Sequence, residues 1–160
     1  MTRPLWRCPE CGQTFVSPNM PHSCVIVPLA AHFDGRPELL AVYERLLGVL
    51  RERGPVTENV TKSRISFQTR MRFAGIERPR RDHIVATFVL TRPVASERVW
   101  KIEPLAPYYY VHRVRLHAPE DVDAELMAWL DEARQVGDQR HLEPGWEKVP
   151  VGSGPASDKE

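Results

Sequence analysis

Residues 62–116 carry the clearest hydrophobic pattern of the chain, and its period is that of β-strands. In the first part, KSRISFQTRMRFAG, the apolar residues are Ile65, Phe67, Met71 and Phe73. The polar residues between them include Arg64, Gln68, Arg70 and Arg72. Because successive side chains of a strand point to opposite faces, this alternation predicts a sheet with one apolar face and one basic face.

The same region predicts a mainly antiparallel sheet of about five strands. The expected strands are 56–61, 63–69, 70–76, 83–90, 98–103 and 108–116, of which the second and third form either one bent strand or a tight hairpin. The connections are short and rich in proline or charge, as in ERPRRD at 77–82. Such connections favour antiparallel neighbours over crossovers through helices.

An amphipathic helix is predicted on each side of the strand region. The segment PELLAVYERLLGVLRERG begins with a proline in its first turn and ends before Gly-Pro. Its apolar stripe is Leu39, Tyr43, Leu46 and Leu50. A second helix is expected over 119–136, and its stripe is Val122, Leu126, Trp129, Leu130 and Ala133.

These elements predict an α+β fold, in which two helices cover one face of a mainly antiparallel sheet in a two-layer domain. We expect a small zinc knuckle at 1–25, a linker at 26–35, the α+β domain at 36–138 and a disordered tail at 139–160. The tail is expected because it has no periodicity and is rich in Pro, Gly and Ser.

The three cysteines all lie near the start of the chain, in WRCPECGQTFVSPNMPHSC. Cys8 and Cys11 form one close pair, and His22 with Cys24 forms a second. Two pairs of sulfur and nitrogen donors suit a tetrahedral zinc ion with no open position for a reacting water. A redox-active pair of thioredoxin type would need a βαβ context, and cysteines that bind no metal are the other alternative.

Composition and charge narrow the class of protein. The chain has 160 residues, of which 42% are hydrophobic, and a net charge of +1. The charged residues are unevenly distributed along the chain. Residues 62–117 contain twelve Lys/Arg and four Asp/Glu, whereas residues 118–138 contain one Arg and seven Asp/Glu. No apolar run approaches the roughly 20 residues of a membrane span, and no secretory leader is evident, so a cytoplasmic location and no membrane partner are expected.

Several motifs taken together resemble a known family. The opening WRCPECGQTF followed by NMPHSC resembles a zinc-binding segment that often precedes a domain of unknown function, DUF5655. The resemblance continues through AHFDGR, TKSRISF, RFAG, VHRVRL and DAELMAWLDEA, and covers roughly 6–141. It implies a small α+β domain, sometimes attached to nuclease-like modules, and supplies no catalytic residues.

The basic strands suggest a surface that binds the phosphates of DNA or RNA. Its candidate residues are Lys62, Arg64, Arg70, Arg72, Arg80, Arg81, Arg113 and Arg115. Trp100 and Tyr109 are candidates for stacking on unpaired bases. The competing interpretation is a solvated sheet face whose arginines only maintain solubility, or whose charge the acidic segment 118–138 cancels.

Two further functions stay open at this point. The second hypothesis is a small-anion or enzymatic pocket around Lys62, Arg64, His83, Tyr110 and His112, with a histidine as acid or base. The chain carries no nucleophile elbow, phosphate-binding loop or dinucleotide fingerprint, so no catalytic residue is assigned. A protein-interaction module built on the knuckle and the proline-rich tail is the third alternative.

Overall fold

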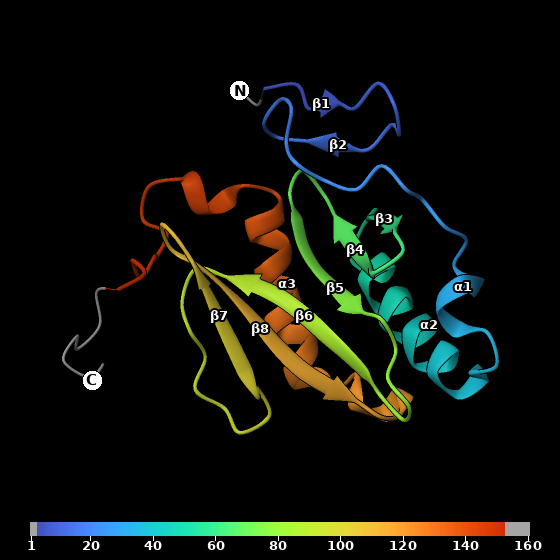
Figure 1. The fold of residues 1–160 in the computed structure, drawn as a ribbon. Helices are drawn as coiled ribbons and strands as arrows, with labels where there is room; N and C mark the ends of the chain where they lie inside the picture. Colours follow the sequence, from blue (N-terminus) through green and yellow to red (C-terminus); the bar gives the residue numbers. More distant parts are fainter. Residues whose placement is uncertain (1–2, 153–160) are drawn as a thin grey trace.

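The computed structural model describes residues 3–152, and these form two antiparallel sheets and three α-helices (Figure 1). The small sheet pairs β1 (Trp6–Arg7) with β2 (Thr14–Phe15). The main sheet has six strands in the order β3-β4-β5-β6-β8-β7. Their bounds are β3 Thr57–Val60, β4 Arg64–Gln68, β5 Arg72–Glu77, β6 Ile84–Leu90, β7 Lys101–Leu105 and β8 Tyr109–Leu116.

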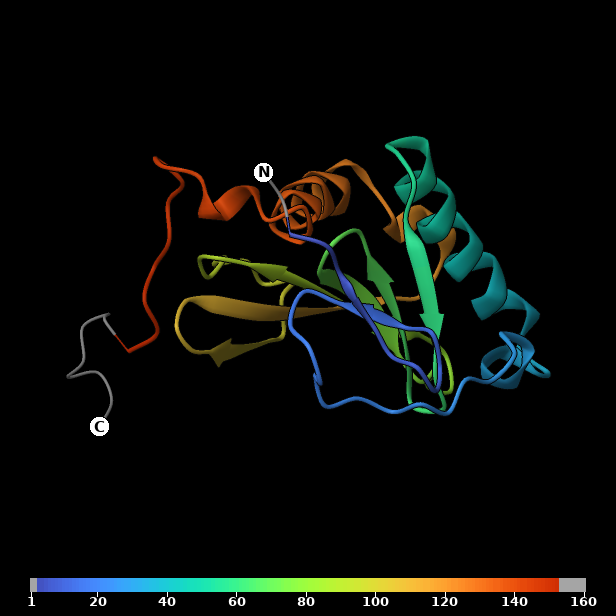
Figure 2. The same cartoon turned by 90° about the horizontal axis from the view of Figure 1, so that it is seen from above.

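The two long helices, α2 (Pro37–Glu52) and α3 (Ala124–Gly137), lie on one face of the main sheet (Figure 2). A short helix, α1 (Ala30–Phe33), precedes α2, and 3₁₀ turns occupy Pro119–Asp121 and Arg140–Leu142. The β1–β2 hairpin lies at the end of the sheet where β4 turns into β5 (Figure 1). The mixed α/β, antiparallel architecture is therefore as expected.

The number of elements differs from the expectation. The main sheet has six strands rather than about five, because 63–76 forms a hairpin and not one bent strand. At the turn the backbone N–H groups of Arg70 and Met71 both donate to the carbonyl of Gly137, which ties the hairpin to the end of α3. The segment expected to be a linker also contains α1, whose Phe33 packs into the core.

The hydrophobic core lies between the helices and the inner face of the sheet. The predicted stripes of both long helices are buried, and Tyr43 of α2 stacks on Phe67 of β4 at 5.9 Å between ring centroids. On the sheet side Ile65 and Phe67 of β4 are buried, whereas Arg64 at the start of that strand is exposed. The alternation read from the sequence thus predicts the apolar face of β4, but it is wrong for Met71, which lies in the turn between β4 and β5 and outside the core.

The C-terminal segment up to residue 152 is ordered by specific hydrogen bonds, which differs from the disordered tail expected from residue 139. The N–H of Val149 donates to the Thr91 carbonyl, and the Tyr110 hydroxyl donates to the Val149 carbonyl. The indole of Trp146 donates to Thr91 Oγ1 at 3.0 Å. The aperiodic, proline-rich sequence does not predict such contacts, because each joins the segment to residues that are distant in the sequence. The rest of the expected tail lies outside the described residues.

The two edges of the main sheet have different covers. The outer strand β7 carries Pro104, which has no N–H to offer a further strand. At the opposite edge, Val27 donates its N–H to the carbonyl of Val60 in β3, and Ile26 forms a bridge with Thr61. Within the described residues, each edge is thus partly closed to further pairing.

Candidate metal centre and basic cleft

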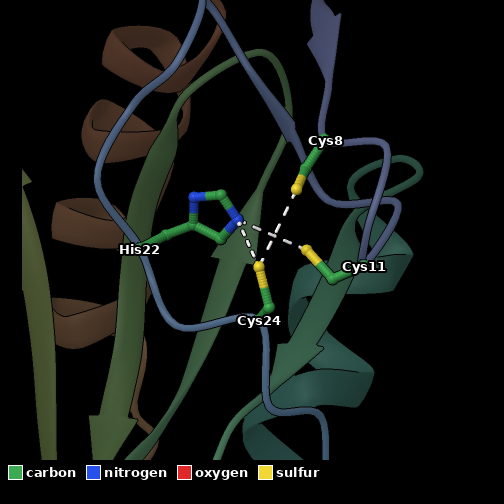
Figure 3. A group of neighbouring side chains, drawn as sticks. All are labelled: Cys8, Cys11, His22 and Cys24. Atoms are coloured by element: carbon green, nitrogen blue, oxygen red, sulfur yellow. Dashed lines mark hydrogen bonds between the residues drawn. The ribbon is translucent and has the colours of Figure 1, made fainter.

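Cys8, Cys11, His22 and Cys24 converge on one point, as the two-pair spacing predicts (Figure 3). Their four ligand atoms all lie within 4.8 Å of one another. The hairpin β1–β2 brings the first pair into a tight turn, in which Gly12 has a φ of +80° and donates its N–H to the Cys8 carbonyl. The loop after β2 returns His22 and Cys24 to the same place.

Three of the six separations among the donor atoms match the edges of a tetrahedron around a small cation. Cys8 Sγ and Cys24 Sγ are 3.8 Å apart, and His22 Nε2 lies 3.3 Å from Cys11 Sγ and 3.4 Å from Cys24 Sγ. Metal bonds of about 2.3 Å to sulfur and about 2.0–2.1 Å to nitrogen give edges of roughly 3.8 Å and roughly 3.5 Å. These four side chains could therefore hold a metal ion.

Neighbouring groups orient two of the donors. Nδ1 of His22 lies 2.6 Å from the Met20 carbonyl, so it carries the proton and leaves Nε2 as the donor facing the sulfurs. The side chain of Gln13 donates to Cys11 Sγ at 3.2 Å and to the Ser23 carbonyl at 2.7 Å. It thereby links the first cysteine pair to the returning loop.

The thiols crowd one another, and their pKa values diverge. Burial raises the pKa of Cys11, but hydrogen bonds from Gln13 and the nearby His22 outweigh it and lower the pKa to about 6. Burial and the two neighbouring sulfurs raise the pKa of Cys24 to about 12. The three thiols cannot all ionise together, because neighbouring thiolates repel one another. A bound cation would offset this repulsion and stabilise the thiolates.

Residues 6–24, which carry the four candidate ligands and form the metal-ligand segment, dock on the outer face of β4 and β5, away from the helices (Figure 2). The Gln68 amide donates to the Thr14 carbonyl at 2.8 Å. The guanidinium of Arg72 lies 4.2 Å from the centroid of the Phe15 ring and donates to Gln13 Oε1 at 2.7 Å. Burial lowers the pKa of Arg72, and the nearby Cys11 raises it.

A cleft of about 490 Å³ opens between the docked segment and the sheet. Its basic lining is Arg64, Arg70 and Arg72. Its other lining residues are neutral at pH 7, with His22 counted as neutral, and are Gln13, Phe15, Val16, Met20, Pro21, His22, Ser23, Asn59, Thr61, Ser63, Ser66 and Met71. No aspartate or glutamate lines the cleft among the described residues.

Two of these arginines bond only to neutral acceptors in the described part of the chain. Arg70 donates to Gln139 Oε1 at 2.7 Å and to the Arg3 carbonyl at 2.6 Å. Arg72 donates to an amide oxygen and a carbonyl, and Arg64 has no side-chain partner within 3–152. No carboxylate therefore pairs with their charges, and only the Cys11 sulfur acts on Arg72.

The other predicted basic residues are scattered over the outer face and its loops. Arg113 pairs with Glu77 at 2.8 Å and with Glu103 at 3.1 Å, and Arg80 lies 3.6 Å from Glu77. Arg115 lies 4.5 Å over the ring of Trp100, whose side chain is partly exposed. Lys62 and Arg81 are exposed, without a side-chain partner among the described residues. The structure thus gathers three of the eight residues in one cleft.

The alternative pocket around histidines does not assemble. His112 is completely buried on the core face of β8, stacked on Phe88 at 4.9 Å. Its Nε2 accepts the Val94 N–H, so its role is structural. Tyr110 is also buried, and Arg64 faces the opposite side of the sheet. The Tyr109 hydroxyl lies 2.8 Å from His141 Nε2, and the Tyr109 ring contacts the rings of Tyr108 and His141.

One group that sequence reasoning missed involves His117. Its ring lies 5.2 Å from that of His83, and both lie near Asp82, so that three ligand atoms fall within 4.8 Å. The register of β6 with β8, in which Ile84 faces Leu116, places the two histidines opposite each other. Strand pairing, which the sequence alone does not give, is the signal that reveals them.

Comparison with known proteins gives one match. A family described as "Domain of unknown function (DUF5655)" matches residues 29–136. No curated protein and no solved structure matches the chain. Among the described residues, no helix combines the length and apolar character needed to cross a membrane.

Proposed function

Because the chain belongs to the DUF5655 family, whose function is unknown, we propose its function from its own surface. It is a zinc-containing protein that binds nucleic acid through the outer, basic face of its main sheet. The zinc ion organises the N-terminal segment, and the cleft beside this segment supplies the strongest binding surface. Arg64, Arg70 and Arg72 carry the charge.

Zinc is the metal that the donor set favours. Three thiols and one imidazole in a tetrahedral arrangement are typical of structural zinc sites, whereas magnesium and calcium prefer oxygen donors. The segment 6–24 buries few apolar residues, of which Cys8 and Phe15 are the main ones. A metal would therefore supply much of the free energy that folds it.

The observation that carries nucleic-acid binding is a cleft with three arginines and no carboxylate. Arg70 and Arg72 are held in place by neutral acceptors, so they present charge without being neutralised. Preorganised guanidinium groups bind phosphate through paired hydrogen bonds and lose little side-chain entropy when they do so.

The acidic segment does not cancel this field by contact. Four of its seven carboxylates pair with other arginines at α3 or its N-terminus. The pairs join Asp131 to Arg53, Glu132 to Arg92, and Asp123 with Glu125 to Arg98. The outer face thus keeps the charge of the cleft. Salt largely screens the interaction between exposed charges that lie farther apart than the Debye length of about 8–10 Å.

Fluorescence anisotropy with labelled single-stranded and duplex oligonucleotides tests the proposal. We expect binding at low salt that weakens steeply as salt rises, because phosphate contacts release counterions. Arg64→Glu should reduce the affinity at least tenfold, while Arg45→Glu, an equal charge change on an exposed turn of α2, should change it little. Absence of binding to every DNA and RNA tested at low salt would remove this function.

A further inference from the structure

The cleft beside the metal-ligand segment has two walls of different chemistry. The wall from the N-terminal segment is largely apolar and includes Phe15, Val16, Met20 and Pro21. The wall from β3, β4 and the turn between them is polar, with hydroxyl groups and Arg64. The cleft is therefore suited to a ligand that is itself apolar on one side and anionic on the other.

An unpaired nucleotide has this division, because its base is a flat apolar ring and its phosphate is a charged group. The cleft volume of about 490 Å³ falls in the range of about 300–1,000 Å³ that small-molecule sites occupy. A duplex keeps its bases stacked inside, so it can offer only phosphates to such a cleft. Single strands expose bases that can leave the stack and enter a pocket.

A path for the neighbouring nucleotides leads out of the cleft. A depression of about 170 Å³ shares Arg64, Ser66 and Arg72 with it and extends across the outer face to Arg113, which pairs there with Glu77 and Glu103. The strand that bears Arg115, with Trp100 beneath its guanidinium, lies three strand positions from β4, or roughly 14 Å at ordinary strand spacing. The outer face thus offers contacts beyond the cleft itself.

We infer that the cleft receives one unpaired nucleotide of a single-stranded nucleic acid, its base against the apolar wall and its phosphate toward Arg64 and Arg70. This inference rests on the proposed function, since it names the form of nucleic acid that the basic face binds. A substitution of Met20 tests the contact with the base separately from the contacts with the phosphate, because Met20 belongs to the apolar wall. The residue is 36% exposed, and truncation of its side chain keeps the backbone carbonyl that faces His22 Nδ1.

The test compares an unmodified single strand, the same strand with abasic positions, and a blunt duplex of equal length, each with the wild-type protein and with Met20→Ala. We expect the unmodified strand to bind at least about fivefold tighter than the abasic strand, the lower limit for one stacked base. Met20→Ala should weaken the binding of the unmodified strand but not the binding of the abasic strand or the duplex. Metal content and hydrogen exchange of segment 6–24 serve as folding controls for the variant.

Each contrary result has a distinct meaning. Equal or tighter binding of the duplex overturns the inference and leaves nucleic-acid binding intact. Equal binding of abasic and unmodified strands does the same, because no base then occupies the cleft. A nucleoside monophosphate should displace the strand better than inorganic phosphate, and equal competition by the two also overturns the inference. Failure of all three nucleic acids to bind removes the proposed function as well.

Discussion

The guanidinium of Arg72 lies 4.2 Å from the centroid of the Phe15 ring and so joins the main sheet to the metal-ligand segment. Phe15 in turn packs against His22 at 4.5 Å between ring centroids. A residue that lines the basic cleft thus also holds the segment that forms the opposite wall. The shape of the cleft is therefore linked through one side chain to the cluster of candidate metal ligands.

Replacing Arg72 with methionine should loosen the N-terminal segment without unfolding the sheet. The change removes a cation–π contact and the hydrogen bond to Gln13, together on the order of 1–3 kcal/mol at this half-buried site. Hydrogen exchange should quicken at β1 and β2 and stay slow in β6 and β8. Arg64→Met is the matched control, because Arg64 has no side-chain partner among the described residues, and unchanged exchange in Arg72→Met would show that docking does not depend on this contact.

Cys11→Ser should release the metal and unfold the N-terminal segment alone. The core of the α+β domain, formed by α2, α3 and the inner face of the sheet, contains no residue of that segment. We therefore expect elemental analysis to show loss of zinc, while far-ultraviolet circular dichroism still reports a cooperative unfolding transition. Loss of that transition would mean that the segment is part of the folding unit and not a dependent addition to it.

Two helical glycines should respond to alanine with opposite signs. At Gly48, on an exposed turn of α2, an added Cβ has nothing within 4 Å, so Gly48→Ala should raise the free energy of unfolding by about 0.5–1 kcal/mol. At Gly137 the Cβ would lie 2.6 Å from Thr69 Oγ1 and 2.7 Å from Phe73 Cδ1. Gly137→Ala should therefore lower stability by about 1–3 kcal/mol. Urea denaturation of both variants measures the difference, and a stabilised Gly137→Ala would contradict the close approach of hairpin and helix.

The domain should lose stability on acidification below neutral pH. Burial lowers the pKa of His112, and protonation of its Nε2 would break the hydrogen bond from the Val94 N–H. The unfolded chain then binds more protons than the folded chain below the ordinary histidine pKa of about 6.5, so stability falls as the pH drops through and below that value. Burial lowers the pKa of His141 as well, and this adds in the same direction.

Urea midpoints measured between pH 7.5 and 5.5 test this prediction, and the Cys11→Ser background keeps metal release from adding its own pH dependence. The His112→Gln variant should be less stable at pH 7.5 and show a smaller change over the same interval. If the urea midpoint of the Cys11→Ser protein does not change with pH, protonation of His112 and His141 does not lower the free energy of unfolding.

Hydrophobic periodicity predicted the elements that bury one apolar face in the core. The stripes of α2 and α3 are buried, and Ile65 and Phe67 face the core while Arg64 does not. The cysteine and histidine spacing likewise predicted four donors that meet at one point. Each of these features depends on residues close in sequence, which is why a single sequence can indicate them.

Contacts between distant segments could not be predicted in the same way. Sequence reasoning treated the arginines as one surface, but Arg113 pairs with glutamates and Arg70 reaches Gln139, 69 positions away. The ordered path of 139–152 depends on acceptors such as the Thr91 carbonyl. Such pairings are set by strand order and register, which hydrophobic patterning leaves undetermined.

Closure of the two sheet edges affects how copies of this protein can meet. Unprotected edge strands are the usual starting point for aggregation by strand addition. Here Pro104 interrupts one edge, and Ile26 and Val27 occupy part of the other. Strand addition at either edge is accordingly disfavoured, and a concentrated solution of the folded protein should resist fibril growth.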